Sequence, residues 1–418
     1  MAGSSAGWSA ADAENYLGSR EPFGMRFGLE RIRRLLSVLG MPQHRFTAVH
    51  VVGTNGKSSV AEMIAALCEA HGMSAGAYIS PHVDRWSERI RIGGAEIAPA
   101  AFASAVARVA QAVETVDRTL EEGESVTQFE ADTAAAFVAF AEAGVRVGVI
   151  EAGLGGRLDA TNVLQSVVTV LTSIGLEHTQ WLGDTEVEIA GEKLAVLRDH
   201  SALVTGRLSP EVEELARKTA AERHAEIVVV RDLSPAIELP SPAPFLRRNF
   251  GVALAAAERV VGKLDPGKVR DVAAGLELHG RMEVVEGDPP MILDTAHNPD
   301  GARALAEALE TAASGREVFA CMAVLADKDA DAMVAALGAR LSALVATTIP
   351  HEKLASAGRP GAQARAAGDL AKAAANAGVG QVETVEDPGE AIARAVALAR
   401  SAGGVALVCG SHYLLAYV

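Results

Sequence analysis

The segment that most constrains the fold of this chain runs from His50 to Leu67. It begins with an apolar, β-branched run, passes through the turn Gly53-Thr54-Asn55-Gly56-Lys57-Ser58-Ser59 and continues with helical periodicity. A strand, a turn and a helix in this order aim backbone N–H groups and a helix N-terminus at one spot, where phosphate binds well. Lys57 adds a positive charge for the terminal phosphates, and Ser58 or Ser59 offers a hydroxyl to phosphate or Mg²⁺. The segment therefore predicts a nucleotide site.

The loop departs from the common G-x-x-x-x-G-K-[ST] pattern, because Val51 stands where the first glycine would be. The alternative interpretation is a strand-to-helix turn that uses Gly and Asn only for tight geometry. Gly-Lys-Ser at the start of a helix favours phosphate binding over that alternative.

Composition limits the classes of protein that the chain can belong to. A length of 418 residues predicts two domains. With 49% hydrophobic and 22% charged residues, we expect a soluble globular protein. The net charge of −15 argues against a nucleic-acid partner, because no basic stripe is available. Three cysteines far apart (Cys68, Cys321 and Cys409), with no secretion signal and no membrane-length apolar run, predict a cytoplasmic protein with reduced thiols.

Periodicity predicts alternating helices and buried strands, and thus an α/β fold with mainly parallel sheets in both halves. Helices are predicted at about 25–39, 99–116, 129–143 and 185–198, and a hairpin at 89–97. Strands are predicted at 145–150, 167–172, 291–294, 317–323, 343–348, 380–384 and 405–409. Four prolines in 233–245 indicate a linker by composition alone.

Metal-capable side chains follow three strands of the predicted first half. Ser80 lies in a turn after a short strand, Glu151 closes an apolar strand, and His178 lies just past another. Because the carboxyl ends of parallel strands meet at one edge of a sheet, we expect these side chains to converge near the phosphate loop. Hydroxyl, carboxylate and neutral imidazole groups can ligate a divalent ion carried by a nucleotide.

Two glycine- or acid-rich segments complete the set of motifs. Glu151–Asn162 hints at a dinucleotide fingerprint, but its third glycine is misplaced and no helix signal follows, which argues against a nicotinamide dehydrogenase. Asp294–Gly301 places an acid and a histidine at the head of the second half.

Taken together, these motifs resemble those of the folylpolyglutamate synthase/dihydrofolate synthase family, a branch of the Mur ligases. The resemblance covers nearly the whole chain and is specific in its order. In chain order the motifs are Phe27–Ile32, Gly53–Ser58, Tyr78–His82, Thr127–Glu130, Glu151–Asn162, Ser173–Gly183, Asp294–Pro299 and Gly410–Leu414.

The resemblance implies an N-terminal P-loop ATPase domain at 1–281 and a smaller Rossmann-like glutamate ligase domain at 282–418. The boundary moves past the prolines because Asn249 and Arg281 match ATP-contacting residues of the family. Further ATP contacts are implied for Asn55, Gly56, Lys57, Ser58, Ser59 and Asp294. Implied Mg²⁺ ligands are Ser80, Glu151, His178 and Lys193, the last as a carbamate that supports a second ion. Implied catalytic residues are Lys57, His178, Lys193 and His297, and implied substrate contacts are Thr127, Gln128, Phe129, Glu130, Leu158, Asp159 and Ala160.

Three positions depart from the family pattern. Ser58 replaces the usual glycine after the loop lysine, and Thr295 replaces a small residue before Ala-His-Asn. Arg247-Arg248 stand where a His-Gln pair often precedes the asparagine that matches Asn249. The resemblance therefore does not predict how the adenine pocket is formed.

The implied reaction is ATP-dependent addition of L-glutamate to dihydropteroate, to tetrahydrofolate or to both. The substrate carboxylate attacks the γ-phosphate, and the amino group of glutamate then displaces phosphate from the acyl phosphate. Closure of the second domain is expected to bring Asp294 and His297 over the reacting phosphate. The implied cofactors are ATP and two Mg²⁺ ions, with K⁺ as a further candidate. The implied partners are small-molecule substrates, and the implied oligomeric state is a monomer. Two alternatives stay open: a Mur-type ligase for a non-folate carboxylate, and a P-loop ATPase switch.

Overall fold

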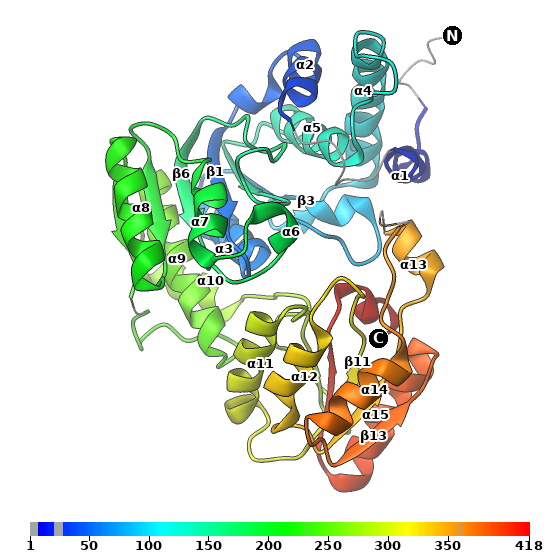
Figure 1. Ribbon diagram of the computed structural model, residues 1–418. Coiled ribbons are helices and arrows are strands. Elements are labelled where there is room, and N and C mark those ends of the chain that lie inside the picture. The colour runs from blue at the N-terminus through cyan, green and yellow to red at the C-terminus, as the bar shows by residue number, and fades with distance from the viewer. Residues whose placement is uncertain (1–6, 21–27, 232, 358, 360) are drawn as a thin grey trace. The chain divides into compact units, whose positions relative to one another are not determined.

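The chain forms two compact units, each built on one sheet. The computed structural model describes residues 7–20, 28–231, 233–357, 359 and 361–418. Unit 1 comprises Met1–Glu238 and Arg248–Ala274, and unit 2 comprises Leu239–Arg247 and Gly275–Val418. Figure 1 shows both sheets covered by helices. The prediction of a two-part α/β fold with mostly parallel sheets is confirmed.

Unit 1 contains an eight-stranded sheet in the order β4-β3-β2-β5-β1-β6-β7-β8. Its strands are β1 Thr47–Val52, β2 Ala75–Tyr78, β3 Ile90–Ile92, β4 Ala95–Glu96, β5 Val147–Glu151, β6 Ser166–Leu171, β7 Ala202–Thr205 and β8 Glu226–Val229. From β2 to β8 neighbouring strands are parallel, and β3 and β4 form the predicted antiparallel hairpin at one edge. Strand β5 is buried along its whole length, as expected for a strand covered on both faces.

The helices of unit 1 cover this sheet. They are α1 Ala10–Ser19, α2 Glu30–Val38, α3 Lys57–Ala70, α4 Pro99–Asp117, α5 Gln128–Glu142, α6 Thr179–Leu182, α7 Glu186–Leu194, α8 Pro210–Glu222, α9 Pro244–Val261 and α10 Pro266–Ala274, with short 3₁₀ turns η1 Pro42–His44 and η2 Trp86–Arg89. The first turn of α9 falls in the segment grouped with unit 2. In Figure 1, helices α1, α2, α4 and α5 lie together, and their apolar faces form one core cluster.

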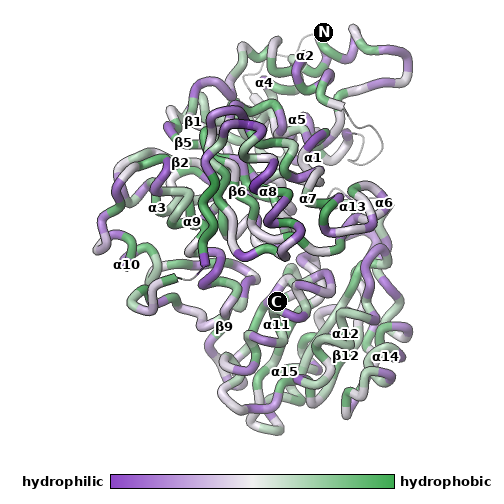
Figure 2. Tube along the Cα trace, turned by 60° about the vertical axis from the view of Figure 1, so that its left-hand side comes forward, coloured by the Kyte–Doolittle hydropathy of each residue, from purple (hydrophilic) through white to green (hydrophobic). Residues whose placement is uncertain are grey.

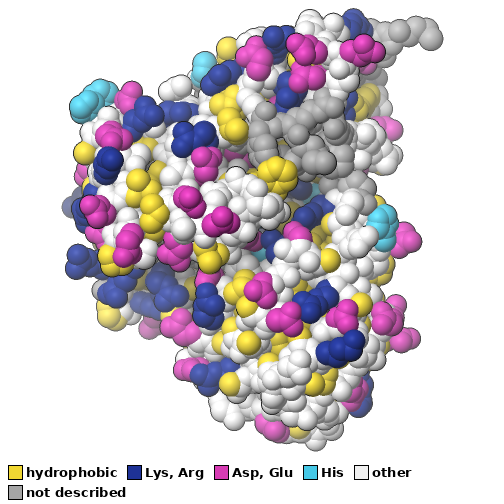
Figure 3. Space-filling model, in the orientation of Figure 1, with side chains coloured by type: hydrophobic (Ala, Val, Ile, Leu, Met, Phe, Trp, Pro, Cys, Tyr) yellow, Lys and Arg dark blue, Asp and Glu magenta, His cyan; other side chains and the backbone are white. Residues whose placement is uncertain are grey.

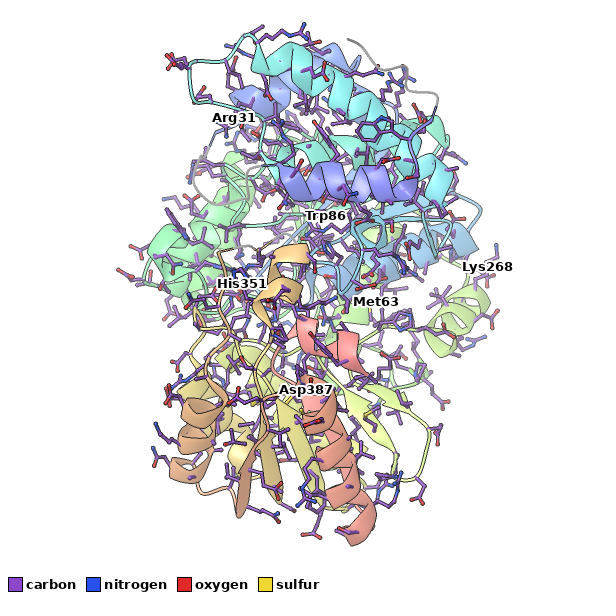
Figure 4. All side chains as sticks on the ribbon, turned by 90° about the vertical axis from the view of Figure 1, so that its right-hand side faces the viewer. Arg31, Met63, Trp86, Lys268, His351 and Asp387 are labelled. Carbon is purple, nitrogen blue, oxygen red and sulfur yellow. The ribbon has the colours of Figure 1, made fainter. Side chains whose placement is uncertain are left out.

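Trp86 joins η2 to the helices of that cluster. Figure 4 shows it beneath α1, whose Glu14 carboxylate accepts hydrogen bonds from the backbone N–H groups of Trp86 at 3.0 Å and Ser87 at 3.3 Å. This contact fixes the chain that leads out of the loop after β2.

Two predicted helices differ from the observed ones. The helix predicted at 25–39 is α2 in the structure and ends before Gly40 at φ 78°, while residues 25–27 lie outside the described residues. The helix predicted at 185–198 is too long, because α7 ends at Leu194. Val196 and Leu197 turn inward and are buried in a small apolar cluster, so core packing stops the helix there.

Unit 2 contains a six-stranded sheet in the order β13-β12-β11-β14-β10-β9. Its strands are β9 Glu283–Val285, β10 Met291–Leu293, β11 Val318–Met322, β12 Ala343–Ala346, β13 Gln381–Thr384 and β14 Val405–Cys409. Its helices are α11 Pro299–Ala312, α12 Ala330–Gly338, α13 His351–Ser356, α14 Ala367–Asn376 and α15 Pro388–Ala402, followed by the 3₁₀ segment η3 His412–Tyr417. The five predicted strands of this half are confirmed.

Strand β9 escaped prediction from the sequence. It pairs antiparallel with β10 at the edge of the sheet, and Val284 and Val285 are exposed. A three-residue edge strand with exposed side chains gives no burial pattern for periodicity to detect.

Hydropathy follows the layers of each unit. In Figure 2 the hydrophobic residues run along the strands, and hydrophilic ones gather on outer helix faces and in loops. The face drawn in Figure 3 carries both signs of charge intermixed, with no continuous basic stripe. In the part of the chain that the structure describes, no helix has the length and apolar character needed to cross a bilayer.

Candidate active site

The turn between β1 and α3 holds the residues of the predicted phosphate-binding loop. Gly56 adopts φ 83°, a conformation that favours glycine, and Lys57 is the first residue of α3. The Lys57 ammonium donates to the carbonyl of Thr54 at 3.0 Å, which folds the side chain back over its own loop. Asn55, Gly56, Lys57 and Ser58 are half-buried, so this loop is accessible from the sheet edge.

Hydroxyl groups at the end of the neighbouring strand β6 hold the loop in place. Thr172 Oγ1 donates to the Asn55 carbonyl at 2.7 Å. Ser173 Oγ accepts from the Asn55 N–H at 3.0 Å and donates to the Asn55 carbonyl at 3.1 Å. A side chain at Gly53 would overlap the Thr172 hydroxyl, so this close approach requires glycine. The loop shape is thus set by strand pairing as well as by its own residues.

Two of the three predicted metal-capable residues, Ser80 and Glu151, lie next to each other in unit 1. The Ser80 N–H donates to Glu151 Oε2 at 2.9 Å, and the Ser58 hydroxyl donates to the Ser80 carbonyl at 3.4 Å. The parallel order β2-β5-β1 explains this, since Ser80, Glu151 and the loop all lie at carboxyl ends of adjacent strands. Glu151 is buried, with an exposed fraction of 2%.

The donor set at this edge fits Mg²⁺ better than a thiophilic metal. Among the described residues, no group of three or more His, Cys, Asp or Glu side chains is close enough to hold an ion by itself. Ser59 is buried, and its hydroxyl has no hydrogen-bond partner in the described part of the chain. Hydroxyl and carboxylate oxygens supplemented by nucleotide phosphates and water are the ligands that Mg²⁺ takes.

His178 lies after β6 at the same edge and in an unusual backbone conformation. Its φ of 52° is left-handed, which is uncommon for a residue with a side chain and recurs at functional sites. It precedes α6, and its Nε2 lies 3.9 Å from Glu177 Oε1.

Lys193 is buried instead of solvated on its helix. Its ammonium donates to the carbonyl of Gly53 at 2.8 Å, directly before the phosphate loop. Burial, and next the positive charge of Lys57, lower the pKa of Lys193 from 10.5 to about 7, while Glu177 and Asp159 oppose the shift. The protonation of Lys193 therefore depends on the charges of Lys57, Glu177 and Asp159.

Asn249, a predicted ATP contact, lies against Gly56 of the predicted phosphate-binding loop within unit 1. A Cβ added to Gly56 would lie 2.8 Å from Asn249 Nδ2. Helix α9 thus closes one side of the loop.

Three of the predicted substrate contacts have internal partners. The Thr127 hydroxyl caps α5 by accepting from the Glu130 N–H, and the Glu130 carboxylate accepts from the Thr127 N–H at 2.8 Å and pairs with Arg31 at 3.1 Å. Gln128 donates to the Leu17 carbonyl at 3.0 Å. These contacts fix the start of α5, and Arg31 is labelled in Figure 4.

The other predicted substrate contacts lie around the turn after β5. The Phe129 ring packs so closely on Gly153 that a Cβ there would lie 2.5 Å from it. Asp159 is buried and accepts from the Leu154 N–H at 2.8 Å and the Thr161 hydroxyl at 2.5 Å. Ala160 is buried, whereas Leu158 is 44% exposed and is the one of these side chains presented to solvent.

The predicted residues of unit 2 form a second group. Asp294 is buried, and its carboxylate accepts from the backbone N–H groups of Met282 at 3.0 Å and Ala296 at 2.8 Å. Burial raises the pKa of Asp294, and the charge of Arg281 opposes the shift. His297 Nδ1 lies 2.9 Å from the Thr295 carbonyl, which can only accept, so this nitrogen carries the proton.

Sequence reasoning missed the residues that hold the loop, above all Thr172 and Ser173. Ser173 begins a recognised motif and Thr172 ends a predicted strand, but only the pairing of β1 with β6 reveals that their hydroxyls reach Asn55. It also missed Glu177 beside Lys193 and His412 beside Arg281.

Comparison with known proteins agrees with this geometry. Residues 280–412 match the family model described as Mur ligase, glutamate ligase domain. A dihydrofolate synthase/folylpolyglutamate synthase from Mycobacterium tuberculosis is 34% identical over 76% of this chain and 74% of its own length. The crystal structure of the M. tuberculosis folylpolyglutamate synthase with ADP and AMPPCP has a TM-score of 0.88 and 32% identity, covering 97% of this chain and 96% of that one. A Yersinia pestis bifunctional folylpolyglutamate synthase/dihydrofolate synthase with AMPPNP and a Mn ion has a TM-score of 0.83 and 29% identity, covering 98% and 97%.

The sequence motifs, the loop geometry and these similarities lead to one assignment. The chain belongs to the dihydrofolate synthase/folylpolyglutamate synthase family of ATP-dependent ligases within the Mur ligase superfamily.

Proposed function

We propose that this protein joins L-glutamate to a folate-type carboxylate at the expense of ATP. The observation that carries the proposal is the phosphate loop held beside Ser80, Glu151 and the buried Lys193. Family membership favours this reaction over a Mur-type ligase for another carboxylate and over an ATPase switch.

The chemistry requires no enzyme nucleophile. The substrate carboxylate attacks the γ-phosphorus of ATP, the bond to the bridging oxygen breaks, and ADP leaves. The neutral amino group of glutamate then attacks the carbonyl carbon of the acyl phosphate, the carbon–oxygen bond to phosphate breaks, and the nitrogen loses a proton to the departing phosphate or to water, which leaves an amide. Catalysis therefore depends on placing the reactants and neutralising charge, for which Lys57 and the loop N–H groups are placed at the start of α3.

Divalent metal fits the oxygen-rich edge of the unit 1 sheet. Ser80, Glu151 and His178 are proposed to hold one Mg²⁺, and a carbamate on Lys193 is proposed to support a second. When bound, Mg²⁺ offsets the charge that develops on the transferred phosphoryl group. A K⁺ site, a monomeric state, a cytoplasmic location and the domain boundary at 281/282 stay predictions.

In unit 2, Arg281 and Asp294 are proposed to contact ATP, and His297 is proposed to take part in catalysis. The buried Asp294 is held by two backbone N–H groups, so it is a fixed acceptor and not a mobile surface carboxylate. In unit 1, the exposed Leu158 beside the turn after β5 is proposed to meet the pterin part of the substrate.

One assay tests the proposed reaction. ADP release is measured with dihydropteroate or with tetrahydrofolate, each with and without L-glutamate. We expect release that requires both the folate-type carboxylate and glutamate. Equal ADP release without a carboxylate would identify an ATPase, and release only with a different carboxylate would point to another ligase of this fold. The two folates also separate a bifunctional enzyme from one that performs a single step.

Replacing His178 tests its role at the metal. His178→Gly removes the imidazole and suits the left-handed backbone at this position. We expect the Mg²⁺ concentration for half-maximal ADP release to rise about tenfold, because one ligand is lost. His200→Gly is the matched control, since His200 is exposed and has φ 59°. An Mg²⁺ titration that His178→Gly leaves unchanged would remove His178 from the metal site.

A further inference from the structure

His412 lies beside Arg281, one of the residues of unit 2 that are proposed to contact ATP. Strands β10 and β14 are parallel neighbours, with Leu293 paired to Val408, and the Asp294 N–H donates to the Val408 carbonyl at 3.0 Å. The carboxyl ends of these strands therefore lie side by side. Asp294 follows one of them, and His412, at the start of η3, follows the other.

The backbone around Arg281 is fixed against the same two strand ends. The Thr295 N–H donates to the Gly280 carbonyl at 2.9 Å. Gly280 adopts φ 63°, and a Cβ there would lie 2.5 Å from the Leu415 side chain of η3. Because η3 packs this tightly on Gly280, His412 and Arg281 are held in one local structure.

The Arg281 guanidinium has two polar neighbours that orient it. One terminal nitrogen donates to the Gly280 carbonyl at 3.2 Å, and the other lies 3.2 Å from His412 Nε2. A guanidinium can only donate, so His412 Nε2 must accept, and His412 is neutral with its proton on Nδ1. This contact determines the direction in which the long, flexible arginine side chain points.

The ring of His297 restricts His412 in turn. The His297 and His412 ring centroids are 5.1 Å apart with an interplanar angle of 47°. His297 is itself oriented by the Thr295 carbonyl at 2.9 Å. Packing against His297 keeps the imidazole of His412 in the orientation in which Nε2 meets Arg281.

We propose that His412 is a positioning residue that holds the Arg281 guanidinium in the orientation needed to contact ATP. The inference rests on the proposed function, in which Arg281 contacts ATP. In this role the imidazole of His412 acts through the hydrogen bond that it accepts from Arg281. The proposed role also explains why a neutral hydrogen-bond acceptor, and not a second cation, lies beside Arg281 at this edge of the sheet.

The test compares two substitutions of His412 in the full-length enzyme. His412→Phe keeps a ring against His297 but removes the acceptor, whereas His412→Gln retains an amide oxygen that can reach the Nε2 position. We expect His412→Phe to raise KM for ATP about tenfold with a smaller effect on kcat and on KM for L-glutamate, because a hydrogen bond to a charged group is lost. We expect His412→Gln to stay within about threefold of wild type. His351→Phe, at an exposed position of α13, is the matched control.

A double-mutant cycle with Arg281→Met separates this inference from the proposed function. If Arg281→Met raises KM for ATP and His412→Phe adds nothing further to it, the two residues act as one unit, as proposed. Three outcomes would overturn the role of His412 while leaving Arg281 in place. They are effects of the two substitutions on KM for ATP that multiply in the double variant, an unchanged KM for ATP in His412→Phe, and an equal rise of KM for ATP in the Phe and Gln variants. An Arg281→Met enzyme with wild-type ATP kinetics would instead overturn the assignment of Arg281 to ATP, and the inference with it.

Thermal melting accompanies each variant of the cycle. If His412 had a merely structural role, its replacement would lower Tm and impair kcat and both KM values together. The Gln variant would then not restore KM for ATP. If His412→Phe does not fold, His412→Met removes the acceptor with a more adaptable side chain and takes its place in the same cycle.

Discussion

Replacing Lys57 by alanine is expected to lower the turnover of ADP release by about 10³-fold or more while the fold stays intact. The ammonium is the positive charge at the start of α3, and it donates a hydrogen bond to the Thr54 carbonyl of its own loop. Loss of a preorganised charge at a transferring phosphoryl group has effects of this order. Because Lys57 is half-buried and, among the described residues, its ammonium bonds to its own loop and to no separate element, we expect little change in Tm.

Two further variants make the Lys57 result specific. Lys268→Ala, at the exposed position labelled in Figure 4, removes a lysine charge from unit 1 far along the sequence and should leave turnover unchanged. Lys57→Arg keeps the charge but changes its shape, so partial activity would separate charge from geometry. A Lys57→Ala enzyme with near wild-type turnover would exclude Lys57 from phosphate binding.

Replacing Lys193 by methionine is expected to lower turnover by about 10²-fold or more without loss of stability. The buried amine lies 2.8 Å from the Gly53 carbonyl, and its pKa is lowered to about 7 by burial and by Lys57. A neutral amine can attack CO₂, forming an N–C bond and releasing a proton, to give the proposed carbamate. Bicarbonate should therefore activate the enzyme, and ¹³C-labelled bicarbonate should give a carbamate NMR signal that Lys193→Met lacks.

The pH dependence of the Lys193 effect has a defined sign. Between about pH 7 and 10.5 the unfolded chain binds the lysine proton and the folded chain does not, so this residue's contribution to the free energy of unfolding rises with pH. Below pH 7 the buried ammonium disfavours the fold most, and Lys193→Met should then have its largest gain in Tm. Carbamate formation should weaken as pH falls through 7, because the protonated amine is not a nucleophile. A Lys193→Arg enzyme with full activity and no response to bicarbonate would contradict this role.

The sequence predicted those parts of the site that depend on local order. The strand, turn and helix around Lys57 follow from apolar pattern and Gly-Lys-Ser, and the meeting of Ser80 with Glu151 follows from their places after parallel strands. The spacing of Thr127 and Glu130 is also that of a capping box, which the structure contains. The family resemblance implied substrate contacts for these residues instead.

What could not be predicted depends on contacts between distant segments. The burial of Lys193 escaped prediction because the charged α7 surface indicates a solvated lysine, while its ammonium reaches Gly53, 140 residues earlier in the chain. The hydroxyl of Thr172 holds Asn55 only because β6 pairs with β1, and strand order is not encoded in the local pattern. The antiparallel β9 is too short and exposed to stand out.

The hydroxyls of Thr172 and Ser173 have a consequence for how the enzyme meets its nucleotide. They hold the Asn55 peptide from both its N–H and its carbonyl, so hydrogen bonds within the fold set the shape of this part of the loop. The entropy of ordering these residues is then lost during folding and not at each encounter with ligand. We therefore expect the loop to keep its shape between catalytic cycles. The rate of ATP binding should then be limited by diffusion and not by rearrangement of the loop.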